Sequence, residues 1–279
     1  MKVLAIGAAG VFAGLVPVAL KDRGISVRAF VRSREQEVSL RTKGYEDIAI
    51  GDLRDVASLD SAMQDVDGVF HIGPSFLKDE AQVGLNVVNA AERAGVRRFV
   101  FSSVIQPTIT RLSNHASKIP VEDALYASRM EYVVLQPANF FQNIGKTWPD
   151  IVKTGVFSEP FPRTARIAHV DFRDVADVVS IAFSENSLNY GTFELCAGLF
   201  NRVEIAAVMS EVLGQVISAE ESSVSGWNAA INDEQTDAMK AIFTYYSHSP
   251  MGGNSLVLKS VLGREPLGIR SYIESLVAH

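Results

Sequence analysis

The sequence contains a single cysteine, Cys196, among its 279 residues. One cysteine cannot form an intramolecular disulfide and cannot anchor a zinc site by itself, so the composition indicates a reducing compartment. No apolar run reaches the ~18 residues that a membrane span requires. Because Lys2 leads directly into an apolar segment, a signal peptide does not fit there, and we expect a cytoplasmic protein.

Runs of basic residues are also missing. Lysine and arginine number 26 against 32 aspartates and glutamates, which gives a formal net charge of −6 at pH 7 with histidine neutral. A general affinity for nucleic acid or for an anionic membrane needs a basic face, so neither is expected as a partner. Hydrophobic residues make up 47% of the chain, enough for a full core in one large domain or in one domain with a small lobe.

The first fourteen residues carry the most informative pattern. Val3–Ile6 is a short apolar run that predicts a strand buried on both faces. Gly7 supplies the freedom to leave that strand, and Gly10 lacks a side chain that would keep a pyrophosphate away from the next helix. That helix is expected from Phe12 to Arg23, and we include Val11 and Phe12 among the candidate cofactor contacts. Small residues after a strand also satisfy ordinary packing, which is the alternative.

A second strand is predicted at Ser26–Val31, and it ends at Arg32 with Arg34 close by. At this place in a nucleotide-binding fold a carboxylate holds the ribose 2′-hydroxyl, whereas a cation tolerates a 2′-phosphate. The two arginines therefore favour NADP over NAD; the alternative is a pair of solvated arginines at a strand end. Ser33–Gln36 has the pattern of a capping box that opens the next helix.

Further strands are predicted at 47–50, 68–72, 98–103 and 132–136. Candidate cofactor residues follow these strands: Asp52, Leu53, Gly73, Pro74, Ser102, Ser103, Pro137, Asn139 and Phe140. Strands that alternate with helices predict an α/β fold, a doubly wound parallel-sheet Rossmann fold whose ligands lie at the carboxyl ends of the strands. His71, inside an apolar strand, is expected to be buried, neutral and without a catalytic role.

The alternation loosens from Asn139 onward. We expect residues 1–138, completed by about 165–198, to form an NADP-binding Rossmann domain, and residues 139–164 with 199–279 to form a smaller, mostly helical lobe that serves the substrate cleft. The acidic segment Asp171–Asp177 opens a helix, where carboxylates complement the helix dipole rather than bind metal. No metal site is expected.

Together these landmarks resemble the NmrA-like family of atypical short-chain dehydrogenases/reductases. The resemblance runs nearly end to end and rests on the order of several motifs: Gly7-Ala-Ala-Gly10, Arg32, Gly51-Asp52, Phe101-Ser-Ser-Val104, Ser117-Lys118 with Val121-Glu122, Gln136–Asn143, His169–Asp177 and Leu262–Pro266. It implies an NADP(H)-binding Rossmann domain with the substrate in a cleft against a small carboxyl-terminal lobe. The family contains reductases of quinones and dyes, and also regulators that bind the dinucleotide without turning it over.

The superfamily's Tyr-x-x-x-Lys pair is incomplete in this sequence. Counting back four residues from Lys118 gives Asn114, with His115 beside it. The resemblance gives Lys118 the role of holding the nicotinamide ribose; the alternative is a surface lysine paired with Glu122. His115 is either a proton donor or a solvated or capping histidine. Pro120 leaves two helix starts open, one near residue 113 and one near residue 117.

These observations favour a reductase that passes hydride from NADPH to a small apolar electrophile such as a quinone, since a reduced quinone needs little acid catalysis. The competing hypothesis is a non-catalytic redox sensor whose partner surface depends on NADP(H) occupancy. Aromatic residues that could line the substrate site, or serve in the core instead, are Phe76, Phe140, Phe141, Trp148 and Trp227. A homodimer and a regulatory protein partner are both compatible with the sequence.

Overall fold

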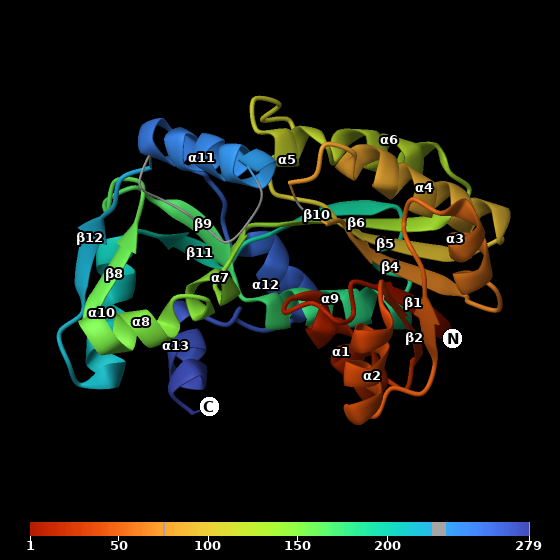
Figure 1. Cartoon of the computed structure of the whole chain (residues 1–279), viewed down its shortest axis with the longest axis horizontal. Helices are drawn as coiled ribbons and strands as arrows, with labels where there is room; N and C mark the ends of the chain where they lie inside the picture. The colour runs from red at the N-terminus through yellow and green to blue at the C-terminus, as the bar shows by residue number, and fades with distance from the viewer. Residues whose placement is uncertain (75, 225–232, 279) are drawn as a thin grey trace. The chain divides into compact units, whose positions relative to one another are not determined.

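A computed structural model describes residues 1–74, 76–224 and 233–278 of the chain. Its central feature is a seven-stranded sheet with the order β10-β6-β5-β4-β1-β2-β3 (Figure 1). The pairs β1–β2, β2–β3, β1–β4, β4–β5 and β5–β6 are all parallel. The predicted doubly wound Rossmann fold is therefore confirmed. The strands are β1 (Lys2–Ile6), β2 (Ser26–Val31), β3 (Ile48–Ile50), β4 (Gly68–Ile72), β5 (Arg98–Ser102), β6 (Glu131–Pro137) and β10 (Gly191–Leu195).

Helices cover both faces of this sheet. In Figure 1, α4 and α6 lie along one face, and α1 and α9 lie along the other. Val3, Leu4 and Ala5 of β1 are completely buried, which explains why this strand reads as a continuous apolar run rather than an alternating one. The helices around the sheet are α1 (Val16–Asp22), α2 (Arg34–Thr42), α3 (Val56–Ala62), α4 (Glu80–Arg93), α5 (Ser113–Ala116), α6 (Ile119–Ala127) and α9 (Phe172–Ser184).

The first helix differs from its predicted span of Phe12–Arg23. The chain forms a 3-10 turn, η1 (Ala13–Leu15), and α1 begins only at Val16. Pro17 lies in the first turn of α1, where the amide that proline lacks has no helical partner in any case. The glycine turn is consequently longer than the sequence pattern indicated.

Helix α4 has an apolar face, on which Val83, Val87 and Ala91 are all buried. Asp79 occupies the N-cap position, but its side chain caps nothing. Its carboxylate instead forms an ion pair with Arg54, at 2.6 Å from Nε. A cation distant in the sequence therefore competes successfully with the first amides of α4 for this carboxylate.

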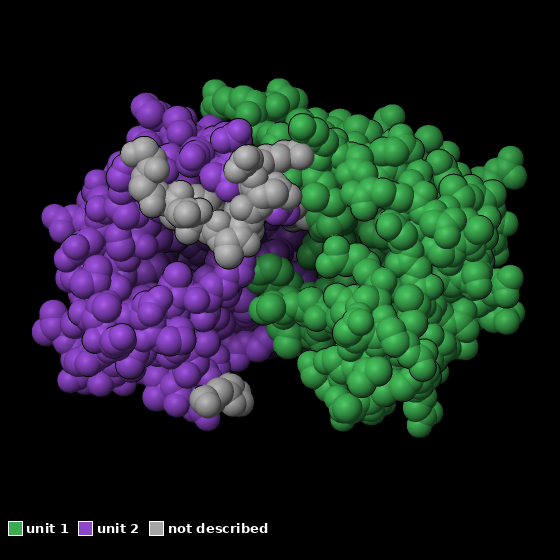
Figure 2. Space-filling view, in the orientation of Figure 1, with its two compact units in different colours: residues 1–136, 175–193 green, residues 137–174, 194–279 purple. Residues whose placement is uncertain are grey.

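The chain divides into two compact units, coloured separately in Figure 2. The first comprises Met1–Gln136 and Val175–Phe193, and the second comprises Pro137–Asp174 and Glu194–His279. The segment that returns to the first unit is thus shorter than the expected 165–198, since residues 165–174 and 194–198 belong to the second unit.

The second unit contains two small sheets besides its helices. One sheet has the order β11-β9-β7, and the other pairs β12 with β8. Its elements are β7 (Asn139–Phe140), α7 (Gln142–Gly145), α8 (Trp148–Thr154), β8 (Val156–Glu159), β9 (Ile167–Val170), β11 (Gly198–Phe200), α10 (Arg202–Leu213), β12 (Ser218–Glu221), α11 (Asp233–His248), α12 (Leu256–Leu262) and α13 (Ile269–Val277). Asn201 and Glu204 form a reciprocal capping box at the start of α10.

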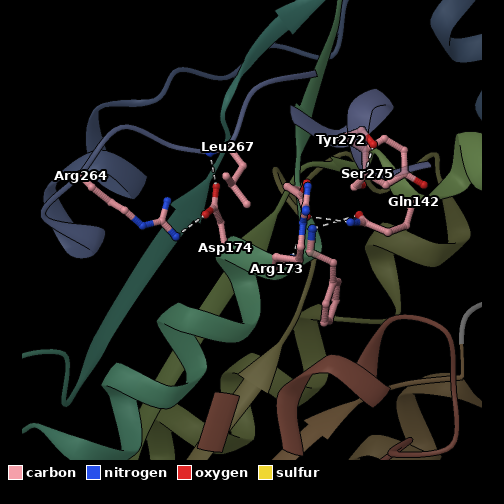
Figure 3. A network of polar contacts seen from close by, with 9 residues as sticks. Gln142, Arg173, Asp174, Arg264, Leu267, Tyr272 and Ser275 are labelled. Carbon is pink, nitrogen blue, oxygen red and sulfur yellow. Dashed lines mark hydrogen bonds and ion pairs between the residues drawn. The ribbon is translucent and has the colours of Figure 1, made fainter. Parts of the chain in front are cut away.

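A polar network in the second unit joins two motifs that lie far apart in the sequence (Figure 3). The buried carboxylate of Asp174 accepts hydrogen bonds from Arg264 Nη2 and from the Leu267 amide, both at 2.7 Å. The buried carboxylate of Asp171 accepts from Arg173 at 2.6 Å and from Gln142 at 2.7 Å. Burial raises the pKa of Asp174, while its two donors oppose the rise. Asp174 thus ties the start of α9 to the segment after α12, and Asp171 ties it to Gln142 of α7.

None of the helices in the described residues combines the length and apolarity needed to cross a bilayer.

Candidate functional site

Three of the predicted site residues of the first unit, Gly7, Gly73 and Pro74, lie where the strand order reverses. The chain passes from β1 to β2 on one side and places β4 on the other, so β1 and β4 flank a topological switch point. Ligands of doubly wound sheets bind in the crevice outside the carboxyl ends of such strands. Gly7 follows β1 at this point, and Gly73 and Pro74 follow β4.

The glycine turn after β1 is tightly packed against its neighbours. Gly7 has a φ of +84°, a conformation that side chains rarely adopt. A Cβ on Gly7 would lie 3.2 Å from the Ile72 side chain and 3.3 Å from the Ala13 methyl group. Ala13 therefore packs directly on the turn. The Gly10 amide donates to the Gly7 carbonyl at 2.8 Å, and Gly10 and Val11 are exposed.

The two arginines after β2 have different environments. Arg34 forms an ion pair with Glu37 at 2.5 Å, and the same Glu37 carboxylate also pairs with Arg41. The Arg32 guanidinium is exposed and bonds to no other residue in the described ranges. The Arg32 amide donates to Gln36 Oε1 at 2.9 Å, and Ser33 Oγ accepts from the Gln36 amide. The expected capping box is therefore only half formed, because the Gln36 side chain reaches Arg32 and not Ser33.

The residues after β3 hold a turn. Asp52 is exposed, and its Oδ1 accepts a hydrogen bond from the Arg54 amide at 2.8 Å. Leu53 packs against the core beside the sheet, and its carbonyl accepts from Asn86. Asp52 thus caps this turn, and its exposed carboxylate remains accessible from solvent.

Lys118 is buried and does not pair with Glu122. It is the N-cap residue of α6, and its ammonium forms an ion pair with Glu80, the first residue of α4. The side chains of Lys118 and Glu80 are 7% and 2% exposed. Because both side chains are buried and paired with each other, Lys118 is not a surface lysine paired with Glu122, and that alternative is excluded.

Glu122, one turn further along α6, accepts hydrogen bonds from three side chains. These donors are Ser103 Oγ at 2.5 Å, Gln136 Nε2 at 3.0 and 3.1 Å, and Tyr126 Oη at 3.0 Å. The carboxylate is buried, so these donors supply the hydrogen bonds that water would otherwise make. Glu122 thereby fixes Ser103 at the carboxyl end of β5.

The chain forms two short helices here, one that begins at Ser113 as in the first alternative and one that begins at Ile119, two residues after the second alternative. The short helix α5 contains Asn114 and His115, and α6 begins at Ile119 with Pro120 in its first turn. Asn114 Oδ1 is buried and has no hydrogen-bond partner in the described part of the chain. The same holds for Ser102 Oγ and for His71 Nδ1. Since buried polar atoms in folded proteins almost always have partners, each of these orphan atoms is available for a hydrogen bond to a bound polar ligand.

The two histidines near Lys118 are held neutral. Burial lowers the pKa of His115, the positive charge of Lys118 lowers it further, and a hydrogen bond to the Gln106 carbonyl opposes the shift. That bond joins Nδ1 to the carbonyl oxygen at 3.0 Å, so Nδ1 carries the proton and Nε2 is left as an acceptor. Burial lowers the pKa of His71 to about 3. In this state His115 has no acidic proton to give at neutral pH.

The remaining candidates belong to the second unit. Pro137 is buried, Asn139 accepts a hydrogen bond from Asn143 at 2.9 Å, and the Phe140 ring packs edge-on against Phe172. Phe141 is completely buried and stacks on His169, so a core role accounts for it.

The other aromatic candidates have separate outcomes. Trp148 packs against the hydrophobic core of the second unit. Phe76, in the first unit, is half-buried and has a φ of +69°. Trp227 lies outside the described residues. The described residues contain no group of three or more histidine, cysteine, aspartate or glutamate side chains that could hold a metal ion.

A model of the NmrA-like family matches residues 1–256. The chain belongs to this family. The NAD(P)H azoreductase of Xenophilus azovorans is 24% identical over 292 residues, which cover 99% of this chain and 97% of the relative. The NADPH-dependent quinone oxidoreductase of Escherichia coli, solved with NADPH, has a TM-score of 0.84 and 22% identity over 99% of this chain and 100% of that one.

A regulator has the same fold. NmrA, a negative transcriptional regulator solved with NADP, has a TM-score of 0.77 and 16% identity, covering 98% of this chain and 94% of that one. The fold of this NmrA-like protein is therefore shared by a reductase and by a regulator, and only the site residues can separate the two functions.

Glu80 is the residue that sequence reasoning missed in this NmrA-like protein. A signal for it exists in the sequence, because Glu80 lies three residues before Val83 and seven before Val87, on the apolar face of α4. A carboxylate on that face must be buried, and a buried carboxylate needs a partner.

Proposed function

We propose that the protein is an NADPH-dependent reductase whose acceptor is a small apolar electrophile such as a quinone. The observation that carries this proposal is the buried ammonium of Lys118 beside Gly73, at the carboxyl end of β4, where the neighbouring strand β5 ends at Ser102 with its hydroxyl unpartnered in the described residues. The side-chain oxygen of Asn114 on α5 is also buried and unpartnered in the described part of the chain. Ser102 ends β5, beside the switch point of the sheet. A dinucleotide ribose and its nicotinamide amide would supply the hydrogen-bond partners that these atoms lack.

Each part of the cofactor has a candidate contact in the first unit. Arg32 would meet the 2′-phosphate, since its guanidinium is exposed and unpaired in the described residues. The turn from Gly7 to Gly10 would hold the pyrophosphate, and Lys118 would hold the nicotinamide ribose. When bound, NADPH supplies the hydride, while the protein orients it and excludes water.

The state of the proton donors favours a quinone over a ketone. Asn114 stands where the superfamily has its tyrosine, and an amide cannot give up a proton at neutral pH. His115 is neutral because burial lowers its pKa. Reduction of a ketone needs an acid, whereas a reduced quinone is a delocalised phenol that can take its proton from water. The azoreductase and quinone reductase relatives support an electron-poor, unsaturated acceptor.

The missing tyrosine also favours a second function, that of an NADP(H)-binding sensor. The likeness to the NmrA regulator supports this alternative. In a sensor, Lys118 and the orphan atoms would serve binding alone, and no acceptor would be reduced.

An anaerobic assay separates these functions. The protein is incubated with NADPH and a panel of quinones, azo dyes, ketones and imines, and the absorbance of the reduced nicotinamide is followed. Oxidation of NADPH by quinones or azo dyes and not by ketones is the expected result. Tight binding of NADPH without turnover of any acceptor would favour the sensor function over the reductase function. Failure to bind NADPH would contradict both proposed functions.

A further inference from the structure

The ion pair of Lys118 and Glu80 joins two helices at their amino-terminal ends. Glu80 lies one turn before Gly84 on α4, and Lys118 lies three residues before Val121 on α6. A Cβ on Gly84 would come within 2.5 Å of the Val121 side chain, so only a glycine lets the two helices approach this closely. That close approach brings the Glu80 carboxylate to the Lys118 ammonium.

Glu80 also binds the chain that follows β4. Its second oxygen accepts a hydrogen bond from the Phe76 amide at 3.0 Å, and Phe76 has a positive φ of 69°. A Cβ on Gly73 would lie 3.2 Å from Glu80 Oε1 and 3.3 Å from Lys118 Nζ. The ammonium therefore lies directly beside Gly73, at the carboxyl end of β4. Phe76, whose positive φ is strained, is therefore held by the same Glu80 carboxylate that pairs with Lys118. Strained backbone of this kind is often found at functional sites.

Glu80 is the carboxylate that balances the charge of Lys118. The other titratable groups around the ammonium are His71 on β4 and His115 on α5, and its positive charge contributes to the lowered pKa of both. Glu122 on α6 has its carboxylate engaged by Ser103, Gln136 and Tyr126. In the described residues, Lys118 thus has two neutral imidazoles and one paired carboxylate around it.

We propose that Glu80 is the positioning residue for Lys118, which keeps the ammonium charged and directs its remaining N–H donors toward the dinucleotide ribose. This inference rests on the proposed function. An ammonium has three N–H donors, and the bond to Glu80 uses one of them. A buried ammonium without a counter-charge gives up its proton at a much lower pH than an exposed one, and a neutral amine would hold the ribose less well.

The test compares Glu80→Gln with a control of similar chemistry. Glutamine keeps the size of the side chain and an acceptor for the Phe76 amide, but it removes the charge. Glu131→Gln is the control, since Glu131 pairs with the buried Arg98 at 2.6 Å at the opposite, amino-terminal end of β6. NADPH affinity is measured by fluorescence from pH 7 to 9.5, with each variant's unfolding checked by circular dichroism.

We expect the NADPH affinity of Glu80→Gln to fall relative to that of the wild type as the pH rises from 7 to 9.5, because a buried ammonium without a counter-charge loses its proton more readily. Wild type and Glu131→Gln should bind NADPH equally at every pH in the range. Glu80→Asp, which restores the charge, should remove the pH dependence. In a Lys118→Met background, Glu80→Gln should cause no further loss, because the two residues act as one unit.

Other outcomes overturn the inference. An affinity of Glu80→Gln that is unchanged, or reduced equally at all pH values, assigns Glu80 a structural role only. If Glu80→Gln alone fails to fold, NADPH affinity is measured instead in Glu80→Asp and in the Lys118→Met background. In that background Glu80→Gln leaves no unpaired ammonium that would prevent folding. A wild-type protein that binds and oxidises NADPH while Glu80→Gln shows no pH dependence removes this inference and leaves the reductase standing. A wild type that does not bind NADPH removes both.

Discussion

The guanidinium of Arg34 lies 2.5 Å from the Glu37 carboxylate, one turn along α2, whereas Arg32 has no such partner in the described residues. The two arginines are therefore unequal candidates for a 2′-phosphate. Recruiting Arg34 would compete with its ion pair, which Glu37 also shares with Arg41. Arg32 can turn toward the ligand without losing a contact.

The first prediction concerns cofactor selectivity. Arg32→Ala should weaken NADP binding by roughly tenfold to a hundredfold, because a charge-assisted bond to phosphate contributes ~1.5 to 3 kcal/mol. NAD binding should stay nearly unchanged, and Arg34→Ala should have a much smaller effect. Titration calorimetry with both dinucleotides measures these changes. Equal affinity of the wild type for NAD and NADP would contradict the assignment of Arg32.

The second prediction concerns the glycine turn. Gly10 is exposed, and a Cβ there would lie 3.1 Å from the Gly7 carbonyl, so a larger residue needs only a small shift to be tolerated. Gly10→Val should therefore fold but should lose NADPH binding, because its branched side chain blocks the approach of the pyrophosphate. Gly10→Ala should bind with intermediate affinity. Full affinity in Gly10→Val, measured beside its melting curve, would place the phosphates elsewhere.

The third prediction concerns stability at acid pH. Burial lowers the pKa of His71 to about 3 and that of His169 to about 4. The unfolded chain takes up these protons first, near pH 6.5, so the stability is complete above that pH and is lost as the pH falls toward 4 and then 3. Each histidine should cost roughly 2 kcal/mol of unfolding free energy between pH 7 and pH 5.

Substitution of His71 isolates this effect. His71 Nδ1 has no hydrogen-bond partner in the described residues, and the ring stacks on Phe101, so phenylalanine can replace it with little loss of contacts. Urea unfolding of His71→Phe at pH 5 and pH 7 should show a smaller difference than the wild type. An identical difference in both proteins would mean that His71 is not buried as a neutral ring.

The fourth prediction separates the roles of Lys118 and His115. With a quinone as acceptor, Lys118→Ala should weaken NADPH binding and slow hydride transfer, since the ribose would lose the contact that we propose for Lys118. His115→Gln should change the rate little, because burial already lowers the pKa of His115 and leaves it without an acidic proton. Stopped-flow rates across pH 5.5 to 8 give the measurement. A wild-type rate that falls near pH 6.5, with the fall abolished in His115→Gln, would make His115 the acid after all.

The fifth prediction uses the vacant tyrosine position. Asn114 lies on α5, and its Oδ1 is buried without a partner in the described ranges. Asn114→Tyr restores the superfamily's pair with Lys118 and should extend turnover from quinones to ketones or imines. Asn114→Phe is the matched control, because it adds the ring without the hydroxyl. Ketone turnover that is equal in the two variants would show that the added hydroxyl does not act as an acid.

Most of the fold could be read from the sequence because its signals are local. The apolar run of Val3–Ile6, the glycines after it and the regular alternation of strands with helices predict a doubly wound sheet, and the ends of β2 and β4 fall where the pattern put them. The candidate role of Arg32 in binding a 2′-phosphate follows from its position after β2 alone. The start of α1 was misplaced because Pro17 sets it, and β12 was missed because its four residues carry no apolar alternation.

The tertiary structure decided which site residues are engaged and which are available. Arg34 is engaged in an ion pair with Glu37, and Asp79 is engaged in one with Arg54. Lys118 pairs with Glu80 rather than with Glu122. Glu80 and Lys118 are separated by 38 residues. Their pairing depends on how closely α4 and α6 pack, and burial is what makes the pair necessary. The sequence determined which residues are candidates for the site, whereas long-range packing determined their charge partners, because burial and pairing arise only once distant segments meet.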